Sequence, residues 1–391
     1  MRTQVGIVGA GPAGLTLALL LQREGIECVA LENRTREYVE RRVRAGLLEH
    51  NTVVLLDELG VGERLAREGL RHGGIYLRRQ GRTTHIPITE LTGRHITIYG
   101  QQEVVKDQIA TLLARGGEIR FEASAVALHD IDSERPVIEY ESDGARERLE
   151  CDWIAGCDGF HGICRPALPD HVATYYDYEY PFGWLGILAE AAPATDELIY
   201  AWHERGFALY TMRSSTISRL YLQVPAGERL EKWSDARIWE ELQTRLRSEG
   251  WRVNEGPILE KGITPMRTFV CEPMQFGNLF LLGDAAHIVP PTGAKGLNLA
   301  VNDARLFADA LTSFYSGGSR ERLHSYTEIA LRRVWRAQDF SNYMTQLLHD
   351  LGNGAFDRML QLSRLDYLGQ STAAAHSLAE NYAGLPATPD F

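Results

Sequence analysis

The chain opens with a pattern of apolar and polar positions typical of a strand, a helix and a second strand. Residues 4–9 are a β-branched run of the buried-strand kind, and an apolar helical stretch follows to about Glu24. A second strand is predicted over residues 27–32. This order of elements predicts a βαβ unit, with the helix packed on a parallel sheet.

The period of the pattern changes along the middle of the chain. Residues 73–99 are strand-like, a helix is predicted over 101–114, and short strands are expected between 119 and 157. Residues 176–189 and 199–225 then alternate with the two-residue period of a half-buried antiparallel sheet. We expect this sheet to be a second domain inserted between parts of the first.

The last third of the chain is mainly helical. An amphipathic helix is predicted over 234–250, with Ser234 as its N-cap, followed by a strand near Phe269 and by helices from Leu297 to about Leu365. Before these helices, residues 283–298 read GDAAHIVPPTGAKGLN. Their Asp, Pro pair, Lys and Asn indicate a ligand loop rather than a linker.

A hairpin is predicted between residues 207–213 and 218–224. Thr211 and Arg213 share one face of its first strand, and Arg219 and Tyr221 share one face of its second. An odd number of residues in the connection would bring all four side chains to the same side, but the sequence does not fix this register. Two arginines on a pocket wall favour a carboxylate receptor, whereas structural ion pairs are the alternative.

Composition narrows the function. Lys and Arg total 41 against 52 Asp plus Glu, and the formal net charge of -11 argues against nucleic acid or an anionic membrane as a partner. The five cysteines show neither a CxxC nor a metal-ligand spacing, which favours a reduced, cytoplasmic setting and no metal site. Without a basic and apolar leader, the chain is expected to be soluble and untargeted.

The glycine turn GAGPAG, residues 9–14, carries the first candidate chemistry. Gly9 permits the tight turn, Gly11 lets the backbone approach a pyrophosphate, and Gly14 allows the helix to pack closely on the strand. Glu32 ends the second strand, where it is placed to accept hydrogen bonds from a ribose. The alternative, an ordinary glycine-rich turn, leaves Glu32 unexplained. A second motif of this kind is not found, so FAD and a nicotinamide cofactor do not each have such a domain.

Two further segments are candidates for contacts with phosphate groups. In the basic segment 33–48, Arg42 and Arg44 are placed to meet phosphates, while a solvated helix face is the alternative for its other arginines. In the segment CDGFHGICR from Cys157, a phosphate-side cluster and a capped turn are equally open interpretations.

The chain resembles the single-component, FAD-dependent aromatic hydroxylases. Three motifs stand in the order of that family: GAGPAG from Gly9, CDGFHGICR from Cys157 and GDAAHIVPPTGAKGLN from Gly283. Agreement extends over nearly the whole chain, including YPFGWLG from Tyr180, RGFAL from Arg205 and NYAGLP from Asn381.

The resemblance implies a mixed α/β fold with a Rossmann-like FAD-binding domain, an inserted antiparallel-sheet substrate domain and C-terminal helices. The FAD-binding domain is expected over residues 1–72, 100–175 and 268–345, and the substrate domain over 73–99 and 176–267. Residues 346–391 are expected to form a helical segment at the interface of a homodimer.

The resemblance also implies roles for individual residues. The FAD site would contain Gly9, Gly11, Gly14, Glu32, Arg44, Gln102, Asp284, Gly293, Leu297 and Asn298, with Arg219 influencing flavin placement. The aromatic substrate would meet Tyr200, Thr211, Arg213, Tyr221 and the carbonyl group of Pro291. A proton would leave the phenol through Tyr200 and Tyr382 towards His72. The nicotinamide nucleotide would meet Asn33, Arg34, Tyr38, Arg42, His161, Arg165 and Arg267.

The implied reaction converts 4-hydroxybenzoate into 3,4-dihydroxybenzoate with NADPH or NADH and O2. NAD(P)H would reduce FAD, and the distal oxygen of a C4a-hydroperoxyflavin would attack the ring ortho to the phenol. A phenolate is the better nucleophile, and a tyrosine pair removes its proton without admitting water.

Two departures from the family leave alternatives open. Thr211 stands where well-known members carry Ser, which admits another phenolic or amino-substituted benzoate as substrate. Asn33 stands where many NADPH-preferring members carry Arg, so the nicotinamide preference is open, with nearby arginines slightly favouring NADPH. A flavin-binding sensor without turnover is the alternative of another class, although such a protein has no need for a deprotonation path.

Overall fold

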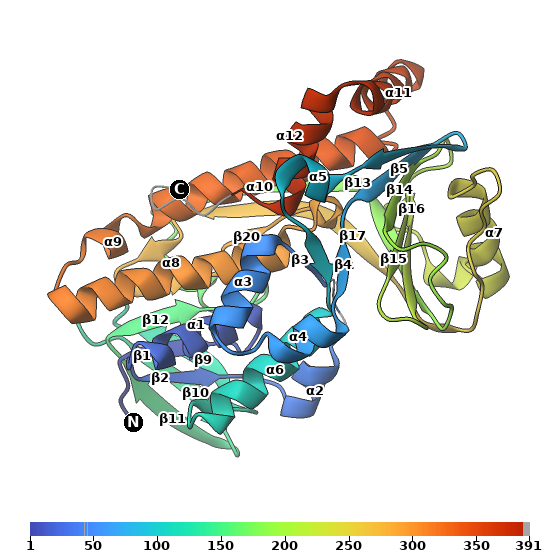
Figure 1. The fold of residues 1–391 in the computed structure, drawn as a ribbon. Helices are drawn as coiled ribbons and strands as arrows, with labels where there is room; N and C mark the ends of the chain where they lie inside the picture. Colours follow the sequence, from blue (N-terminus) through green and yellow to red (C-terminus); the bar gives the residue numbers. More distant parts are fainter. Residues whose placement is uncertain (43, 45, 386–391) are drawn as a thin grey trace.

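The computed structural model of the chain describes residues 1–42, 44 and 46–385. It contains two large sheets with helices around them, and the long helices α8 (Gly296–Gly317) and α10 (Tyr326–Leu348) lie alongside one another in Figure 1. The predicted mixed α/β fold with C-terminal helices is confirmed. The end of the predicted C-terminal segment, 386–391, lies outside the described residues.

The first sheet has six strands in the order β18-β19-β12-β1-β2-β8. They are β1 (Val5–Val8), β2 (Cys28–Leu31), β8 (Glu118–Arg120), β12 (Trp153–Gly156), β19 (Leu279–Leu281) and the antiparallel edge strand β18 (Gln275–Phe276). All four residues of β1 are buried, because parallel strands are covered on both faces.

The two coverings of this sheet are visible at β1. On one face the Ile7 side chain packs against helix α1 (Pro12–Arg23), because a Cβ added at Gly14 of this helix would lie 3.1 Å from the Ile7 side chain. On the other face a Cβ at Gly6 would lie 2.5 Å from Ile138. Ile138 belongs to a second layer of three strands, β9 (Ser124–His129), β10 (Val137–Ser142) and β11 (Ala145–Glu150). The predicted βαβ unit is therefore present, with a small sheet behind it.

The second large sheet has eight strands in the order β20-β17-β13-β16-β15-β14-β5-β6. They are β5 (Ile75–Arg79), β6 (Arg82–Ile86), β13 (Thr174–Ala189), β14 (Leu198–Trp202), β15 (Ala208–Met212), β16 (Ser218–Pro225), β17 (Ile258–Glu272) and β20 (His287–Ile288). One face packs on α7 (Asp235–Arg245), and the other faces α11 (Ala355–Gln370) and α12 (Thr372–Ala383). Strands β13 and β17 cross the domain boundaries predicted near residues 176 and 268, so the division into domains stays a prediction.

The register of the hairpin, left open by the sequence, brings the four candidate side chains to one face. Thr211 lies opposite Arg219 across β15 and β16, and Leu209 lies opposite Tyr221. The connection runs from Arg213 to Ile217, an odd number of residues. Tyr200 on β14 lies opposite Leu209 and extends the same face.

Three predictions of secondary structure were incomplete. Strand β17 covers Ile258–Glu272 rather than only the neighbourhood of Phe269, because Gly262 and Pro265 interrupt its alternation. Helix α5 (Ile88–Thr92) interrupts the strand-like stretch 73–99. The pattern alone ended the helices near Leu365, whereas α11 and α12 continue them to Ala383 within the helical segment 346–391 that the resemblance implied.

The remaining elements connect these layers. Strands β3 (Leu47–Leu48), β4 (Leu70–His72) and β7 (Ile96–Ile98) form a small sheet, and the other helices are α2 (Arg36–Arg41), α3 (His50–Glu58), α4 (Glu63–Glu68), α6 (Gln101–Ala114) and α9 (Glu321–His324). None of the helices in the described ranges combines the length and the apolar character needed to cross a bilayer.

Candidate active site

A cavity of about 1000 Å³ lies at the carboxyl ends of the parallel strands. It is lined by the segments that follow β1, β2, β12 and β19, which is where open α/β sheets bind ligands. The predicted residues that line it are Gly9, Gly11, Glu32, Asn33, Arg34, Tyr38, Arg42, Arg44, Gln102, His161, Arg267, Asp284, Pro291 and Leu297. Sequence positions far apart thus converge on one space large enough for a dinucleotide.

Of the residues predicted for FAD and the nicotinamide nucleotide, Gly14, Gly293, Asn298 and Arg165 are not among those that line this cavity. Pro291 lines it, but the other residues predicted for the substrate, for the proton path and for flavin placement do not: His72, Tyr200, Thr211, Arg213, Arg219, Tyr221 and Tyr382. A Cβ at Gly293 would lie 2.5 Å from Oγ of Ser341, so Gly293 packs on α10. The Asn298 side chain accepts hydrogen bonds from the Glu49 amide at 2.9 Å and the Thr52 hydroxyl at 2.8 Å. These contacts anchor the start of α8 behind the cavity, and any contact of residues 293 and 298 with a flavin stays a prediction for their backbone.

Glu32 connects the end of β2 to the glycine turn. One carboxylate oxygen accepts from the Ala10 amide at 2.9 Å, and the other accepts from the Arg34 amide at 3.0 Å. The turn needs its glycines, since Gly9 has a φ of 103° and a Cβ at Gly14 would lie 2.1 Å from the Gly9 carbonyl oxygen. By contrast, a Cβ at Gly11 would meet no heavy atom within 4 Å. That empty space beside Gly11 fits a pyrophosphate at the start of α1.

The other end of the cavity carries Asp284 and unpaired polar atoms. Desolvation raises the pKa of Asp284, against the lowering effects of His287, Arg44 and Arg42. The Gln102 side-chain oxygen is buried without a hydrogen-bond partner among the described residues. Because a buried polar group normally has a partner, these groups fit the polar chain of a bound FAD.

A buried pair that the sequence reasoning missed supports this end. Asp303 on α8 accepts from the Gly283 amide at 2.9 Å and lies 2.7 Å from Nε2 of His287. Burial lowers the pKa of His287, but Asp303 more than offsets it, and the pKa is raised. The pair fixes the turn on which Asp284 stands.

Aromatic contacts organise the arginines near Phe160. The Arg165 guanidinium lies 4.5 Å from the Phe160 ring and donates to the Ala285 carbonyl at 3.2 Å. The Arg267 guanidinium also lies 4.5 Å from the centre of the Phe160 ring, and it pairs with Asp177 at 2.5 Å. Arg165 therefore braces the wall, whereas Arg267 lines the cavity.

The hairpin face holds a second polar cluster. Arg213 donates to the Arg44 carbonyl at 3.0 Å, and its Nε is buried without a partner among the described residues. Burial lowers the pKa of Arg213, and the Tyr221 phenol opposes this effect. Nε and Nη1 of Arg219 are likewise buried and unpaired in the described part of the chain. Such donors favour an anionic ligand or cofactor nearby.

Gly186 makes room for this cluster and was not singled out from the sequence. It lies opposite Tyr221 in the sheet, and a Cβ there would be 3.2 Å from Nη2 of Arg219 and 3.4 Å from the Tyr221 ring. Thr211 is buried beside them and donates to the Met212 carbonyl at 3.3 Å.

A buried tyrosine pair completes the face. The hydroxyl oxygens of Tyr200 and Tyr382 lie 2.6 Å apart, and burial raises the pKa of both phenols. His72 on β4 is also buried, and neither of its ring nitrogens has a partner among the described residues. Burial lowers the pKa of His72 to about 4, so its imidazole is neutral near pH 7.

The glycine turn, the acid that ends β2 and the cavity above the sheet define a flavin-binding protein. The chain belongs to the FAD binding domain family, whose model matches residues 2–341. Over 389 residues it is 48% identical to the p-hydroxybenzoate hydroxylase of Acinetobacter baylyi (strain ATCC 33305 / BD413 / ADP1), covering 99% of this chain and 96% of that protein.

More distant relatives agree. The 3-amino-4-hydroxybenzoate 2-monooxygenase of Streptomyces cremeus is 26% identical over 345 residues, which cover 85% of this chain and 84% of that one. The crystal structure of p-nitrophenol 4-monooxygenase PnpA from Pseudomonas putida DLL-E4 superposes with a TM-score of 0.84 at 17% identity, covering 98% of this chain and 99% of that chain. The chain is therefore an FAD-dependent aromatic monooxygenase.

Proposed function

We propose that the chain hydroxylates 4-hydroxybenzoate to 3,4-dihydroxybenzoate, using NAD(P)H and O2. The observation that carries this proposal is the buried Tyr200 and Tyr382 pair on the sheet face that also holds Arg213. The face offers a cation for a carboxylate and a hydroxyl pair for a phenol, which are the two polar groups of this substrate. The relative named for p-hydroxybenzoate supports the same choice.

In this proposal the Arg213 guanidinium binds the substrate carboxylate. The planar guanidinium suits two carboxylate oxygens. Because burial disfavours the charged form of Arg213 and lowers its pKa, a carboxylate bound beside it would stabilise that charge strongly. Thr211 and Tyr221 contribute hydroxyl groups beside it. Pro291, which lines the cavity in a short 3-10 turn, separates the aromatic ring from the flavin.

Proton removal falls to the tyrosine pair. Tyr200 would accept a hydrogen bond from the substrate phenol, and Tyr382 would continue the path. His72 would stand at the outer end and pass the proton on to solvent, because an imidazole with a pKa of about 4 does not hold a proton near pH 7. Among the described residues His72 forms no hydrogen bond with either tyrosine, so water would complete the path. Keeping this path narrow excludes bulk water from the reacting ring.

The cofactor assignments follow the cavity. Gly9, Gly11 and Glu32 would hold the adenosine half of FAD, and Arg44, Gln102 and Asp284 the flavin half, with Arg219 near the ring. FAD, when bound, supplies the oxygen chemistry. NAD(P)H would bind against Asn33, Arg34, Tyr38, Arg42, His161, Arg165 and Arg267, with nearby arginines slightly favouring NADPH.

Another phenolic or amino-substituted benzoate is the second candidate substrate. Thr211 adds a methyl group to a buried position beside Arg213, which alters the shape available around the carboxylate. The Streptomyces cremeus relative is named for 3-amino-4-hydroxybenzoate, which is a reason to include aminobenzoates in the experiment.

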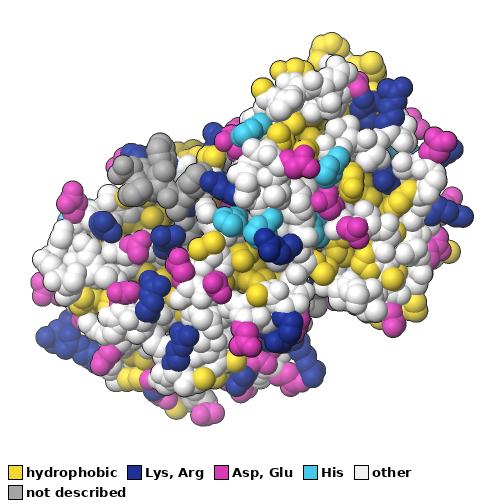
Figure 2. Space-filling model, viewed as in Figure 1, with side chains coloured by type: hydrophobic (Ala, Val, Ile, Leu, Met, Phe, Trp, Pro, Cys, Tyr) yellow, Lys and Arg dark blue, Asp and Glu magenta, His cyan; other side chains and the backbone are white. Residues whose placement is uncertain are grey.

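We also propose a cytoplasmic homodimer. On α11 the large apolar side chains of Phe356, Met359 and Tyr367 are 77%, 64% and 61% exposed. Figure 2 shows hydrophobic side chains gathered over this end of the molecule. An exposed apolar patch of this kind favours a protein interface.

The decisive experiment is oxidation of NADH and of NADPH by the FAD-loaded enzyme across a panel of hydroxybenzoates and aminobenzoates, with product identification. We expect 4-hydroxybenzoate to accelerate oxidation most and to give 3,4-dihydroxybenzoate in an amount equal to the nicotinamide consumed. Acceleration that yields hydrogen peroxide without hydroxylated product would reject 4-hydroxybenzoate as the substrate.

A further inference from the structure

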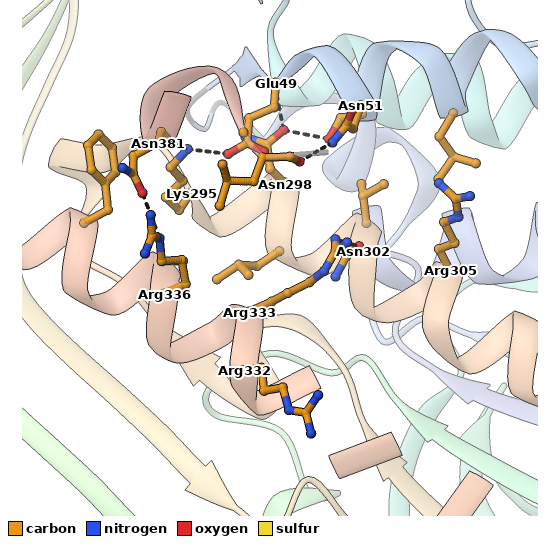
Figure 3. A pocket seen from close by; sticks show the side chains of 18 residues that line it. Glu49, Asn51, Lys295, Asn298, Asn302, Arg305, Arg332, Arg333, Arg336 and Asn381 are labelled. Atoms are coloured by element: carbon orange, nitrogen blue, oxygen red, sulfur yellow. Dashed lines mark hydrogen bonds and ion pairs between the residues drawn. The ribbon is translucent and has the colours of Figure 1, made fainter. Parts of the chain in front are cut away.

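A second cavity, of about 330 Å³, lies against α8 (Figure 3) and is lined by residues of this helix other than those that line the flavin cavity. Gly296, Leu297 and Ala300 of α8 line the flavin cavity, whereas Asn298, Leu299, Asn302 and Arg305 line the second one. Helices α3 and α10 and the end of α12 form the other walls. One helix thus lines two cavities, and nothing in the reaction proposed above uses the second.

The charge of this cavity is opposite to that of the whole chain. Among the described residues, its lining contains Lys295, Arg305, Arg332, Arg333 and Arg336 and one acid, Glu49. Five cations less one anion give these lining residues a formal charge of +4, whereas the whole chain has a formal net charge of -11. Such a concentration of positive charge attracts anions to the cavity.

Part of this positive charge is already neutralised. Lys295 pairs with Glu49 at 2.5 Å, and Arg332 pairs with Glu328. In the described part of the chain, neither Arg305 nor Arg336 forms an ion pair with a carboxylate, although the charge of Arg305 opposes the burial that raises the pKa of Asp309 on the same helix. Arg336 instead donates to the neutral side-chain oxygen of Asn381 at 2.9 Å, as Figure 3 shows.

A buried donor gives a second, independent indication. Asn302 lines the cavity, its oxygen accepts from Arg333, and its side-chain nitrogen is buried without an acceptor among the described residues. A buried donor left unpaired is costly, so an acceptor from a ligand would be favourable here.

The rest of the lining is apolar. Leu55, Leu299, Ala337 and Phe340 are buried around the cavity. Binding pockets for small molecules begin at about 300 Å³, so the space suits a compound with one ring rather than a nucleotide. An apolar body with an anionic group matches both parts of the lining better than an inorganic anion does.

We propose that this cavity is a second binding site for a small aromatic carboxylate, the class that contains the proposed substrate and product. The choice of ligand rests on the proposed function. Its carboxylate would meet the side-chain nitrogen of Asn302, and its ring would lie against Leu299 and Phe340. Arg336 and Arg305, which lie at opposite ends of the cavity in Figure 3, would stabilise the negative charge from either side.

The site has a direct connection to the tyrosine pair. Lys295 lies in its wall, donates to the Tyr382 carbonyl at 3.1 Å and lies 5.1 Å from the Phe340 ring. Asn298 in the same wall donates a hydrogen bond to the carbonyl of Ala294, just before α8 begins, at 3.0 Å. A ligand that shifts Lys295 therefore reaches the backbone of Tyr382.

The test is equilibrium dialysis of radiolabelled 4-hydroxybenzoate with the FAD-loaded enzyme in the absence of NAD(P)H. We expect two bound equivalents per chain. Arg336→Glu and Arg305→Glu, both surface arginines whose replacement spares the core, should each weaken the second equivalent at least tenfold. Arg247→Glu makes the same charge change at an exposed position after α7 and should retain both equivalents.

One bound equivalent in the wild type, or two with unaltered affinity in both cavity variants, would overturn the proposal. Displacement of the second equivalent by inorganic phosphate as readily as by benzoate would also overturn it, because the site would then be a general anion site. Failure of the proposed function is distinguishable, since it appears as missing hydroxylated product in the turnover assay whatever the number of bound equivalents.

Discussion

The phenolic oxygens of Tyr200 and Tyr382, 182 residues apart in the sequence, lie 2.6 Å from one another in a fully buried contact. Tyr200 comes from the sheet and Tyr382 from the C-terminal helix α12. Two phenols whose pKa values are both raised by burial stay neutral, so each is able to donate one hydrogen bond and accept another.

We expect Tyr200→Phe to reduce hydroxylation by about 100-fold or more, the usual range for losing a group that transfers a proton. Reduction of the flavin by NAD(P)H should remain largely intact, because the carboxylate contact is untouched. The measurement is hydroxylated product formed per NAD(P)H consumed. Tyr210→Phe is the matched control, since Tyr210 lies in the same sheet on the opposite face.

Arg213→Ala should weaken binding of 4-hydroxybenzoate by about 2–5 kcal/mol, because it leaves a carboxylate without its buried partner. Phenol, which lacks the carboxylate, should bind the variant and the wild type equally. Fluorescence or absorbance titration of the bound flavin measures both affinities. Unchanged affinity for 4-hydroxybenzoate would remove Arg213 from the substrate site.

The glycine turn offers a paired test of fold and function. Gly14→Ala places a Cβ 2.1 Å from a carbonyl oxygen, so we expect a loss of about 3 kcal/mol or more in the free energy of unfolding. Gly11→Ala meets no atom within 4 Å and should alter the stability of the apoprotein by only about 1 kcal/mol. The Gly11 variant should nevertheless bind FAD at least about tenfold more weakly, a cost of about 1.4 kcal/mol. Equal FAD affinity in Gly11→Ala and wild type would contradict a pyrophosphate at this position.

The Asp303 and His287 pair predicts a pH dependence of stability. Since Asp303 raises the folded-state pKa of His287, the stabilisation is fully present below the unfolded pKa of about 6.5 and is lost as pH rises through the folded value. Asp303→Asn should lower the free energy of unfolding by about 3–5 kcal/mol at pH 6. The difference from wild type should narrow at pH 9, as measured by urea unfolding of the apoprotein. A gap that stays constant with pH would show that His287 does not titrate with the pair.

Local patterns in the sequence predicted the βαβ unit, the glycine turn and which residues share a strand face. The five-residue connection from Arg213 to Ile217, visible only in the structure, determined that Thr211 and Arg219 face the same way. The length of β17 escaped prediction because glycine and proline break its alternation. The contact of Asp303 with Gly283 had no local signal, because helical periodicity marks Asp303 only as buried, not what it meets.

Resemblance, rather than periodicity, pointed to the long-range contacts. The sequence pattern placed Tyr382 after the last predicted helix, and no spacing rule relates it to Tyr200. The basic cavity beside α8 was not anticipated either, because its arginines occur at positions that look like an ordinary solvated helix face.

The parallel pairing of β14 with β5 has a consequence for how the chain is made. The two strands come from segments far apart in sequence, and α12 must then pack over the same face before Tyr382 reaches Tyr200. Long-range pairings of this kind form late and slowly. During synthesis β1, α1 and β2 with the glycine turn therefore leave the ribosome long before α12, and a chain that ends before α12 would lack both Tyr382 and the helix that buries Tyr200.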